Sequence, residues 1–279
     1  TAPGLLLEHN SKVIVLLPGP PNEMQLMFEE EVAPYLLDKR PNKEILIRTI
    51  KCIGLGESML EETIKKLGRW DLPPISYVAR GFEVDLQIKG YGKPENAEAM
   101  LAEADKRISS ILGNYIFGRD DDTLLNVVAR LLKDNKKSLA LAESCSGGLL
   151  ADMITDIPGS SYYFKGGMVA YSNHAKSCLL GIDPEVLARE GEVSEATATA
   201  MAEKTRLMFQ SDIGLGITGI AGPESDRSRK KVGLVFIALA DEAGTQCHEL
   251  NLGGGRRIIK ERSAQAALNL LRKKLLIEN

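Results

Sequence analysis

The feature that most constrains the fold is the stretch SLALAESCSGGLLADMITDI, residues 138–157. Its first part is a short apolar run of the length typical of a buried strand, and its last part repeats apolar residues at helical spacing. The glycine pair Gly147 and Gly148 separates the two parts, and glycine permits the tight turn that such a junction needs. The stretch therefore predicts a strand that turns directly into a helix, which is the repeating unit of an α/β fold.

The same alternation continues through residues 119–279. Further strands are predicted at GGMVAYS, IGLGITGI, VGLVFIALAD and QCHELNL. Helices are predicted at GRDDDTLLNVVARLLKDNKK, at SEATATAMAEKTRLMFQ with Ser194 as its cap, and at RRIIKERSAQAALNLLRKKLL. Strands and helices mixed in this order predict an α/β sandwich with a partly antiparallel, mixed sheet.

Two smaller regions precede this one. Residues 39–118 follow the order strand–helix–strand–strand–helix, which is typical of a small α+β domain of the KH type. The stretch Gly54-Leu55-Gly56-Glu57 lacks the G-x-x-G pattern with which KH domains clamp nucleic acid, so a spacer is the favoured role. Residues 1–38 contain one predicted strand and one predicted helix, too little to close a core.

Composition excludes several classes of protein. The net charge of −3, from 38 acidic and 35 basic residues, provides no overall positive field for nucleic acid. The four cysteines are scattered, which argues against a disulfide framework and a zinc site and fits a reducing cytoplasm. No stretch approaches the about 20 apolar residues that span a bilayer. We expect a cytoplasmic protein without a membrane partner or a bound metal.

Functional groups of α/β folds gather where strands end and helices begin. At the first junction three potential nucleophiles are consecutive, Ser144, Cys145 and Ser146. Serine chemistry needs an activating base, and no histidine is placed for a Ser-His-Asp arrangement. Lys176 would serve if burial lowers its pKa, and Tyr171 on the same turn could relay a proton. The residues alone leave the nucleophile open, and a solvated surface lysine is the alternative for the base.

Five stretches together resemble the CinA family of competence/damage-inducible proteins: AESCSGG, YSNHAK, GEVSE, TGIAGP and GGRRIIKERSAQAALNLL. They follow the family's order, and residues 119–279 resemble its C-terminal nicotinamide-nucleotide (NMN) amidase domain. Residues 39–118 are similar to its KH-like connector. Residues 1–38 resemble the closing part of its molybdopterin-binding-like α/β domain. The resemblance implies that this first domain is incomplete and that most of its ADP-ribose pyrophosphatase site is absent.

The resemblance also implies which residues act. The family's nucleophile falls on Ser144, its lysine and tyrosine fall on Lys176 and Tyr171, and Cys145 is left with a packing role. The reaction implied is hydrolysis of NMN to nicotinic acid mononucleotide and ammonia through an acyl-enzyme, with no cofactor and no metal. Backbone N–H groups of the turn after the nucleophile would stabilise the oxyanion. The implied substrate-binding residues are Ser146, Gly147, Gly148, Asn173, Thr218, Gly219, Ala221, Gly222 and Arg256.

One departure from the family pattern bears on activity. Residues 222–233 are GPESDRSRKKVG, where the family has a glycine-rich loop, and fewer glycines weaken the expectation of close backbone contact with substrate. Arg227, Arg229 and Lys230 are alternative phosphate contacts, or parts of a solvated basic loop. A catalytically weak nucleotide-binding or regulatory protein is therefore the alternative function. The resemblance further implies a homodimer in pyridine nucleotide salvage, and nucleic acid is not expected as a partner.

Overall fold

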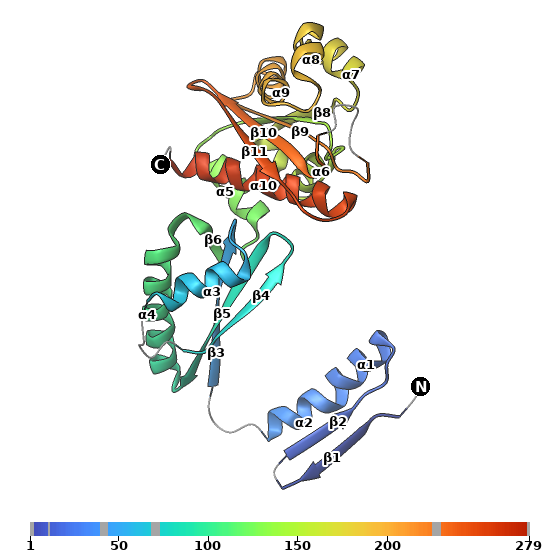
Figure 1. The fold of residues 1–279 in the computed structure, drawn as a ribbon. Helices are drawn as coiled ribbons and strands as arrows, with labels where there is room; N and C mark the ends of the chain where they lie inside the picture. The colour runs from blue at the N-terminus through green and yellow to red at the C-terminus, as the bar shows by residue number, and fades with distance from the viewer. Residues whose placement is uncertain (1–2, 11, 40–43, 68–72, 225–229, 278–279) are drawn as a thin grey trace. The chain divides into compact units, whose positions relative to one another are not determined.

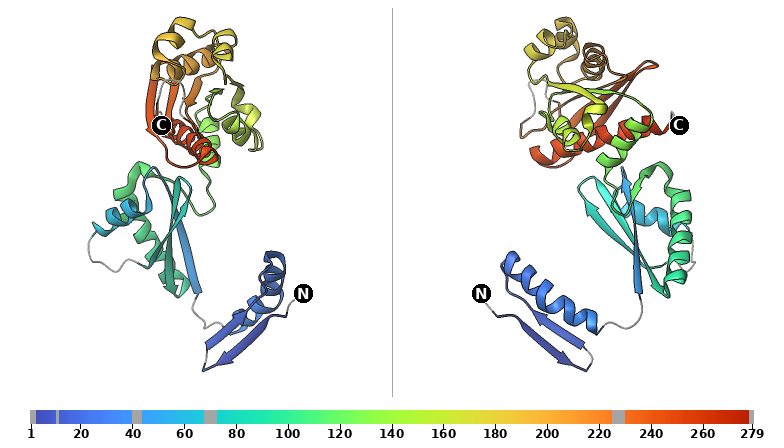
Figure 2. Two further views of the ribbon diagram at one scale, coloured as in Figure 1. Left: turned by 45° about the vertical axis from the view of Figure 1, so that its right-hand side comes forward. Right: turned by 180° about the vertical axis from the view of Figure 1, so that it is seen from behind.

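The computed structural model describes residues 3–10, 12–39, 44–67, 73–224 and 230–277. The chain forms two compact units. One contains Thr1–Leu46 and Gly90–Met100, and the other contains Ile47–Lys89 and Leu101–Asn279. Figures 1 and 2 show the elements of each unit.

The N-terminal segment is a hairpin followed by a helical stretch. Strands β1 (Leu5–His9) and β2 (Lys12–Leu16) pair antiparallel, and helices α1 (Pro21–Met27) and α2 (Ala33–Asp38) follow, joined by a π-helical turn. Strand β1 was not predicted from the sequence. Many large apolar side chains of this segment are exposed, as expected where two strands and one helical stretch have too few partners to close a core; they include Leu5, Leu7, Ile14, Leu16, Leu26, Phe28 and Leu37.

The KH-like region has the predicted element order. It consists of β3 (Glu44–Ile53), α3 (Glu57–Lys65), β4 (Ile75–Arg80), β5 (Glu83–Gly92) and α4 (Pro94–Leu112). A further strand, β6 (Ile116–Arg119), pairs antiparallel with β3, so the sheet has the order β4-β5-β3-β6. A strand of four residues carries too little periodicity to be predicted from sequence.

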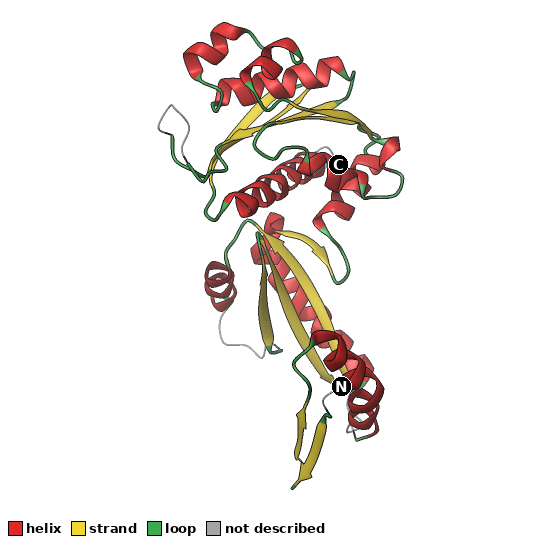
Figure 3. Cartoon of the chain, turned by 90° about the vertical axis from the view of Figure 1, so that its right-hand side faces the viewer, coloured by secondary structure: helices red, strands yellow, loops and turns green. Residues whose placement is uncertain are grey.

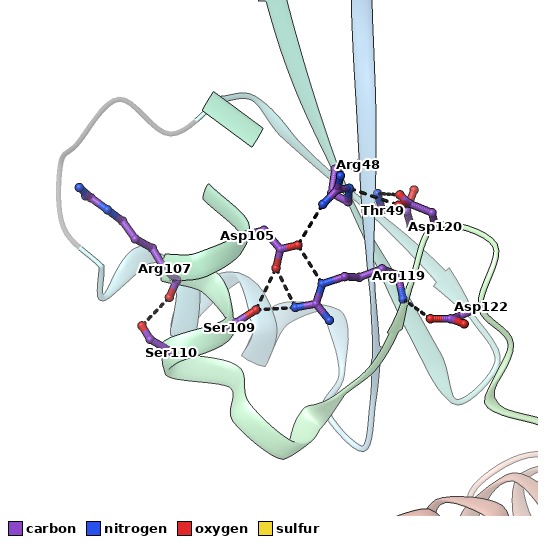
Figure 4. A network of polar contacts seen from close by, with 9 residues as sticks. All are labelled: Arg48, Thr49, Asp105, Arg107, Ser109, Ser110, Arg119, Asp120 and Asp122. Atoms are coloured by element: carbon purple, nitrogen blue, oxygen red, sulfur yellow. Dashed lines mark hydrogen bonds and ion pairs between the residues drawn. The ribbon is translucent and has the colours of Figure 1, made fainter. Parts of the chain in front are cut away.

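A polar network joins α4 to strands β3 and β6 (Figure 4). The Asp105 carboxylate accepts hydrogen bonds from Arg119 at 2.7 and 2.8 Å, from Ser109 at 2.9 Å and from Arg48 at 3.3 Å. Burial raises the pKa of Asp105, but the bonds from Arg119 and Ser109 outweigh it, so the net shift is downward. The carboxylate therefore stays charged and fixes the helix against the sheet edge.

The C-terminal region is built on a five-stranded sheet of order β11-β10-β9-β7-β8. Strand β7 (Leu139–Glu143) lies between β8 (Phe164–Val169) and β9 (Ile213–Gly219) and is parallel to both. Strands β10 (Leu234–Asp241) and β11 (Gly244–Asn251) continue the sheet antiparallel. This arrangement confirms the predicted mixed sheet.

Helices cover both faces of this sheet (Figures 1 and 3). One face carries α7 (Asn173–Cys178), α8 (Pro184–Glu190) and α9 (Glu195–Met208). The other carries α5 (Leu124–Asp134), α6 (Leu149–Thr155) and α10 (Arg256–Ile277). Ser194 caps α9 as predicted, because its hydroxyl accepts a hydrogen bond from the N–H of Thr197 at 3.2 Å.

Glycines let α9 lie close to the middle of the sheet. A Cβ at Gly216 would stand 2.5 Å from the carbonyl oxygen of Ala198, and one at Gly214 would stand 2.1 Å from that of Ala202. The alternating glycines of IGLGITG therefore face the helix, and the larger side chains Leu215 and Ile217 fill the opposite core.

Within the described ranges no helix is long and apolar enough to cross a membrane. The same part of the chain contains no group of three or more histidine, cysteine or acidic side chains arranged to hold a metal ion.

Candidate active site

The turn after β7 is closed by the side chain that ends the strand. Gly147 and Gly148 have φ values of 65° and 90°, the left-handed region that favours glycine. The Glu143 carboxylate then accepts hydrogen bonds from the N–H groups of Gly148, Leu150 and Ala151 at 2.8 to 3.1 Å. The positive end of α6 is thus neutralised from within the chain.

This capping engages N–H groups of the turn that were expected to face an oxyanion. The Gly148 N–H points to Glu143, and the Gly147 N–H donates to the carbonyl of Ser144 at 3.1 Å. The backbone N–H groups of Cys145 and Ser146 lower the pKa of the Cys145 thiol, against the larger effect of burial. The turn therefore offers no free N–H from the two glycines to a developing oxyanion, because the protein already uses them.

Ser144 and Lys176 meet at the end of the parallel strands. Lys176 Nζ donates to Ser144 Oγ at 3.1 Å. Both are buried, with 6% of Ser144 and 1% of Lys176 exposed. Burial lowers the pKa of Lys176, and Glu192 and Cys145 raise it by less. The amine is therefore easier to deprotonate than a solvated lysine, and it touches the hydroxyl that it would activate.

Short elements place Lys176 at this point. The N–H of Ala170, after β8, donates to the carbonyl of Glu143 at 2.8 Å, which keeps the ends of β7 and β8 together. Ser172 caps α7 by accepting from the N–H of Ala175 at 3.1 Å. The last turn of this short helix then directs Lys176 inward rather than to solvent, against the usual preference of lysine.

A pocket of about 190 Å³ opens over this pair. It is lined by residues at or after the ends of β7, β8 and β9, by residues of the segment before α9 and by one residue at the start of α10: Ser144, Cys145, Tyr171, Lys176, Glu192, Val193, Gly219, Ile220, Ala221, Gly222, Glu224 and Arg256. Its charged groups are two carboxylates, a lysine and an arginine, so it suits a small ligand that itself carries both charges.

Tyr171 and Arg256 meet at the pocket. Arg256 Nη2 donates to the Tyr171 hydroxyl at 2.7 Å, and Nη1 donates to the carbonyl of Gly222 at 2.6 Å. The Tyr171 side chain is 56% exposed. Among the described residues its hydroxyl has no hydrogen bond to Ser144 or Lys176. The structure therefore brings Tyr171 to the pocket through Arg256, a contact that the sequence did not predict.

Several predicted substrate-binding residues do not line the pocket. Thr218 is buried, and its hydroxyl donates to the carbonyl of Glu192 at 2.7 Å, a structural bond between the strand end and the segment before α9. Ser146 is buried, and its hydroxyl has no partner among the described residues. Asn173 is exposed at the start of α7. Gly219, Ala221, Gly222 and Arg256 do line the pocket.

Cys145 is a core side chain. Burial raises the pKa of its thiol to about 11, so the reactive thiolate is not formed near neutral pH. It belongs to the apolar cluster between the sheet and α10. Among the described residues, Ser144 is the one of the three consecutive nucleophiles that has a base within hydrogen-bond distance.

The loop that departs from the family pattern is described in part. Arg227 and Arg229 lie outside the described residues. Lys230 donates to the carbonyls of Val193 at 2.5 Å and Glu190 at 3.4 Å, so its ammonium group holds the segment before α9.

Sequence reasoning missed the acidic residues of the site. Glu143, Glu192 and Glu224 were not nominated, although two of them lie inside quoted motifs. The signal for Glu143 was a carboxylate at the end of an apolar strand, directly before a helix N-terminus. Glu192 precedes the cap of α9, and its place beside Lys176 depends on how α7 and α9 pack on the sheet.

Two family models match the chain. The model for the CinA C-terminal domain matches residues 121–275, and the model for the damage-inducible protein CinA KH domain matches residues 47–118. The chain belongs to the CinA family. Solved structures of the CinA superfamily have the fold of its C-terminal region. One from Klebsiella pneumoniae is 29% identical with a TM-score of 0.54, and it covers 55% of this chain and 96% of its own. One from Agrobacterium tumefaciens is 34% identical with a TM-score of 0.51 and covers 55% and 96%.

Longer CinA relatives match almost the whole chain. A competence-damage inducible protein from Caldicellulosiruptor bescii is 44% identical over 99% of this chain and 67% of its own length. One from Moorella thermoacetica is 45% identical over 97% of this chain and 66% of its own length. This chain therefore spans about two thirds of the length of these relatives.

Proposed function

We propose that the chain hydrolyses the carboxamide of nicotinamide mononucleotide, with Ser144 as nucleophile and Lys176 as base. The observation that carries the proposal is the buried contact of 3.1 Å between Lys176 Nζ and Ser144 Oγ. A desolvated amine with a lowered pKa is suited to take a serine proton near neutral pH. The choice of substrate rests on the resemblance of the motifs to the family's amidase domain.

The proposed reaction has two stages. Neutral Lys176 accepts the Ser144 proton while Oγ bonds to the carboxamide carbon. The tetrahedral intermediate breaks its C–N bond, and ammonia leaves with a proton returned from Lys176. Water then adds to the acyl-enzyme, and the C–Oγ bond breaks to release nicotinic acid mononucleotide and restore the serine. No group outside the chain, the substrate and water is required.

Tyr171 is the proposed donor to the oxyanion. The glycine N–H groups of the turn are engaged, whereas the Tyr171 hydroxyl lines the pocket and accepts its own hydrogen bond from Arg256. Its proton can therefore be directed to the substrate, where one such donor contributes about 3 kcal/mol to transition-state binding. Arg256 would also contact the 5′-phosphate of the substrate at the rim.

The other parts of the proposal concern organisation. Residues 119–279 would form the catalytic domain, residues 39–118 a connector, and residues 1–38 part of a further domain. The enzyme would act as a cytoplasmic homodimer in pyridine nucleotide salvage.

The deciding experiment is ammonia release from NMN by the wild type, Ser144→Ala and Lys176→Ala. Both variants should lose at least about 1,000-fold in kcat, because nucleophile and base act as a unit. Ser177→Ala, which alters a half-buried serine of α7 that does not line the pocket, is the matched control and should retain activity. Full deamidation by Ser144→Ala would overturn the proposal. NMN binding without ammonia release by the wild type would instead favour the nucleotide-binding alternative.

A further inference from the structure

A second pocket lies at the opposite end of the three parallel strands. Its volume is about 460 Å³. It is lined by the residues that precede those strands, Ser138 before β7, Tyr163 before β8 and Asp212 before β9. The two pockets lie at opposite ends of β7, which has 5 residues. They are therefore separated by the length of that strand, at about 3.3 Å per residue. The second pocket is therefore distinct from the one at Ser144.

Four lysines line this pocket, Lys133, Lys136, Lys137 and Lys165. Lys133 lies in the last turn of α5, Lys136 and Lys137 lie between α5 and β7, and Lys165 lies in β8. Lys137 lies 3.8 Å from Glu242. The other three form no ion pair with any described residue. The lysines at the end of α5 also suit the negative end of that helix, but Lys165 is outside that helix and has no such role.

The acidic residue of the pocket, Asp212, already accepts hydrogen bonds from within the chain. The Asp212 carboxylate accepts hydrogen bonds from the N–H and the hydroxyl of Ser138, at 2.7 and 2.5 Å. The hydroxyl bond from Ser138 is the main cause of the lowered pKa of Asp212. These bonds keep the Asp212 carboxylate charged, and Lys137 also lowers its pKa. Asp212 therefore offsets part of the positive charge of the four lysines and leaves an excess of positive charge in the pocket. Because its lysines outnumber its carboxylate, the pocket suits a ligand with more than one negative charge.

Two tyrosines add a specific requirement. Tyr163 is 2% exposed, and its hydroxyl is buried with no hydrogen-bond partner among the described residues. A buried hydroxyl without a partner is costly, so a ligand acceptor would satisfy it. Tyr162, beside it, is 83% exposed and offers an aromatic face at the mouth of the pocket.

From these features we infer that the pocket binds a polyphosphate chain, free or as part of a nucleotide. The lysines bind the phosphate oxygens, the Tyr163 hydroxyl donates to one of them, and in a nucleotide the base stacks on Tyr162. The volume fits a ligand of nucleotide size.

The backbone at Lys136 provides a clean variant. Lys136, the second residue after α5, has a φ of 53°, a conformation that glycine adopts more readily. Lys136→Gly therefore removes a pocket charge while it relieves the backbone. Gln210, the second residue after α9, has a φ of 50° and does not line the pocket, so Gln210→Gly is the matched control.

The test is calorimetric titration of the full chain with sodium tripolyphosphate and with ATP. Saturable one-to-one binding is expected. Lys136→Gly, Lys165→Gln and Tyr163→Phe should each weaken binding about tenfold, the loss of one hydrogen bond to a charged group. The melting temperature of Tyr163→Phe should not fall, because its hydroxyl has no partner to lose. Gln210→Gly and the exposed-lysine control Lys204→Gln should bind as the wild type does.

The two probes separate the two sources of the phosphate chain. Tighter binding of ATP, abolished by Tyr162→Ala, assigns the pocket to a nucleotide, and equal binding of both probes assigns it to a free chain. The inference is overturned if neither probe binds saturably or if the three pocket variants bind as the wild type does. It is also overturned if Arg256→Ala alone abolishes binding, because the ligand would then occupy the Ser144 pocket.

Discussion

Lys176 Nζ lies 3.1 Å from Ser144 Oγ, although 32 positions separate the two residues in the chain. The contact forms because β7 and β8 are parallel neighbours whose ends lie side by side, and each is followed at once by a turn. Burying a lysine amine without a carboxylate in contact lowers the stability of the fold. The presence of Lys176 should therefore affect both the free energy of unfolding and the activity.

The first prediction concerns the stability cost of this lysine. Lys176→Met should abolish ammonia release and raise the free energy of unfolding by about 1 kcal/mol, because an apolar side chain replaces a desolvated amine. Urea unfolding near pH 7 measures the change. Lys204→Met, at an exposed position of α9, should bring no such gain. A less stable Lys176→Met protein would contradict the argument.

The second prediction concerns pH. The base must be neutral, so kcat/KM should rise with pH through the pKa of Lys176, and burial places that rise below the pH expected for a solvated lysine. Glu192 raises this pKa, so Glu192→Gln should move the rising limb of the pH profile to lower pH. Glu224→Gln alters the other pocket carboxylate and serves as control. An equal shift in both variants would refute a specific role for Glu192.

The third prediction separates binding from chemistry at the rim. Arg256→Ala should raise KM for NMN about tenfold or more and leave KM for nicotinamide riboside, which lacks the phosphate, nearly unchanged. Tyr171→Phe should instead lower kcat for both substrates, since it removes the proposed oxyanion donor. Steady-state kinetics with the two substrates distinguishes these patterns. If Arg256→Ala raised KM equally for both substrates, a phosphate contact of Arg256 would be ruled out.

The fourth prediction concerns the carboxylate under the catalytic turn. Glu143→Gln replaces one acceptor oxygen with a donor, so part of the cap on Gly148, Leu150 and Ala151 is lost. The free energy of unfolding should fall by about 1–3 kcal/mol, the cost of buried unsatisfied groups. Glu185→Gln, in the exposed first turn of α8, should change it by less than about 0.5 kcal/mol. Similar effects in both would show that the cap contributes little.

The pattern of apolar residues along the chain was sufficient to predict most of the helices and strands. Apolar periodicity located the strands of the C-terminal sheet, the long helices and the element order of the KH-like region. It did not reveal β1 or β6, because both are short strands. Pairing with β2 and with β3, rather than an apolar pattern of their own, keeps them extended.

By itself the sequence determined the mixed α/β fold and the turn on which Ser144 lies, since turn chemistry and hydrophobic period are properties of neighbouring residues. The tertiary structure decided what the side chains there can do. In the tertiary structure Lys176 is buried against Ser144, and the Arg256 side chain donates a hydrogen bond to Tyr171. The N–H groups at the start of α6 bind the Glu143 carboxylate rather than a ligand. Burial and hydrogen-bond partners depend on distant segments packing together, and one-dimensional pattern does not contain that information.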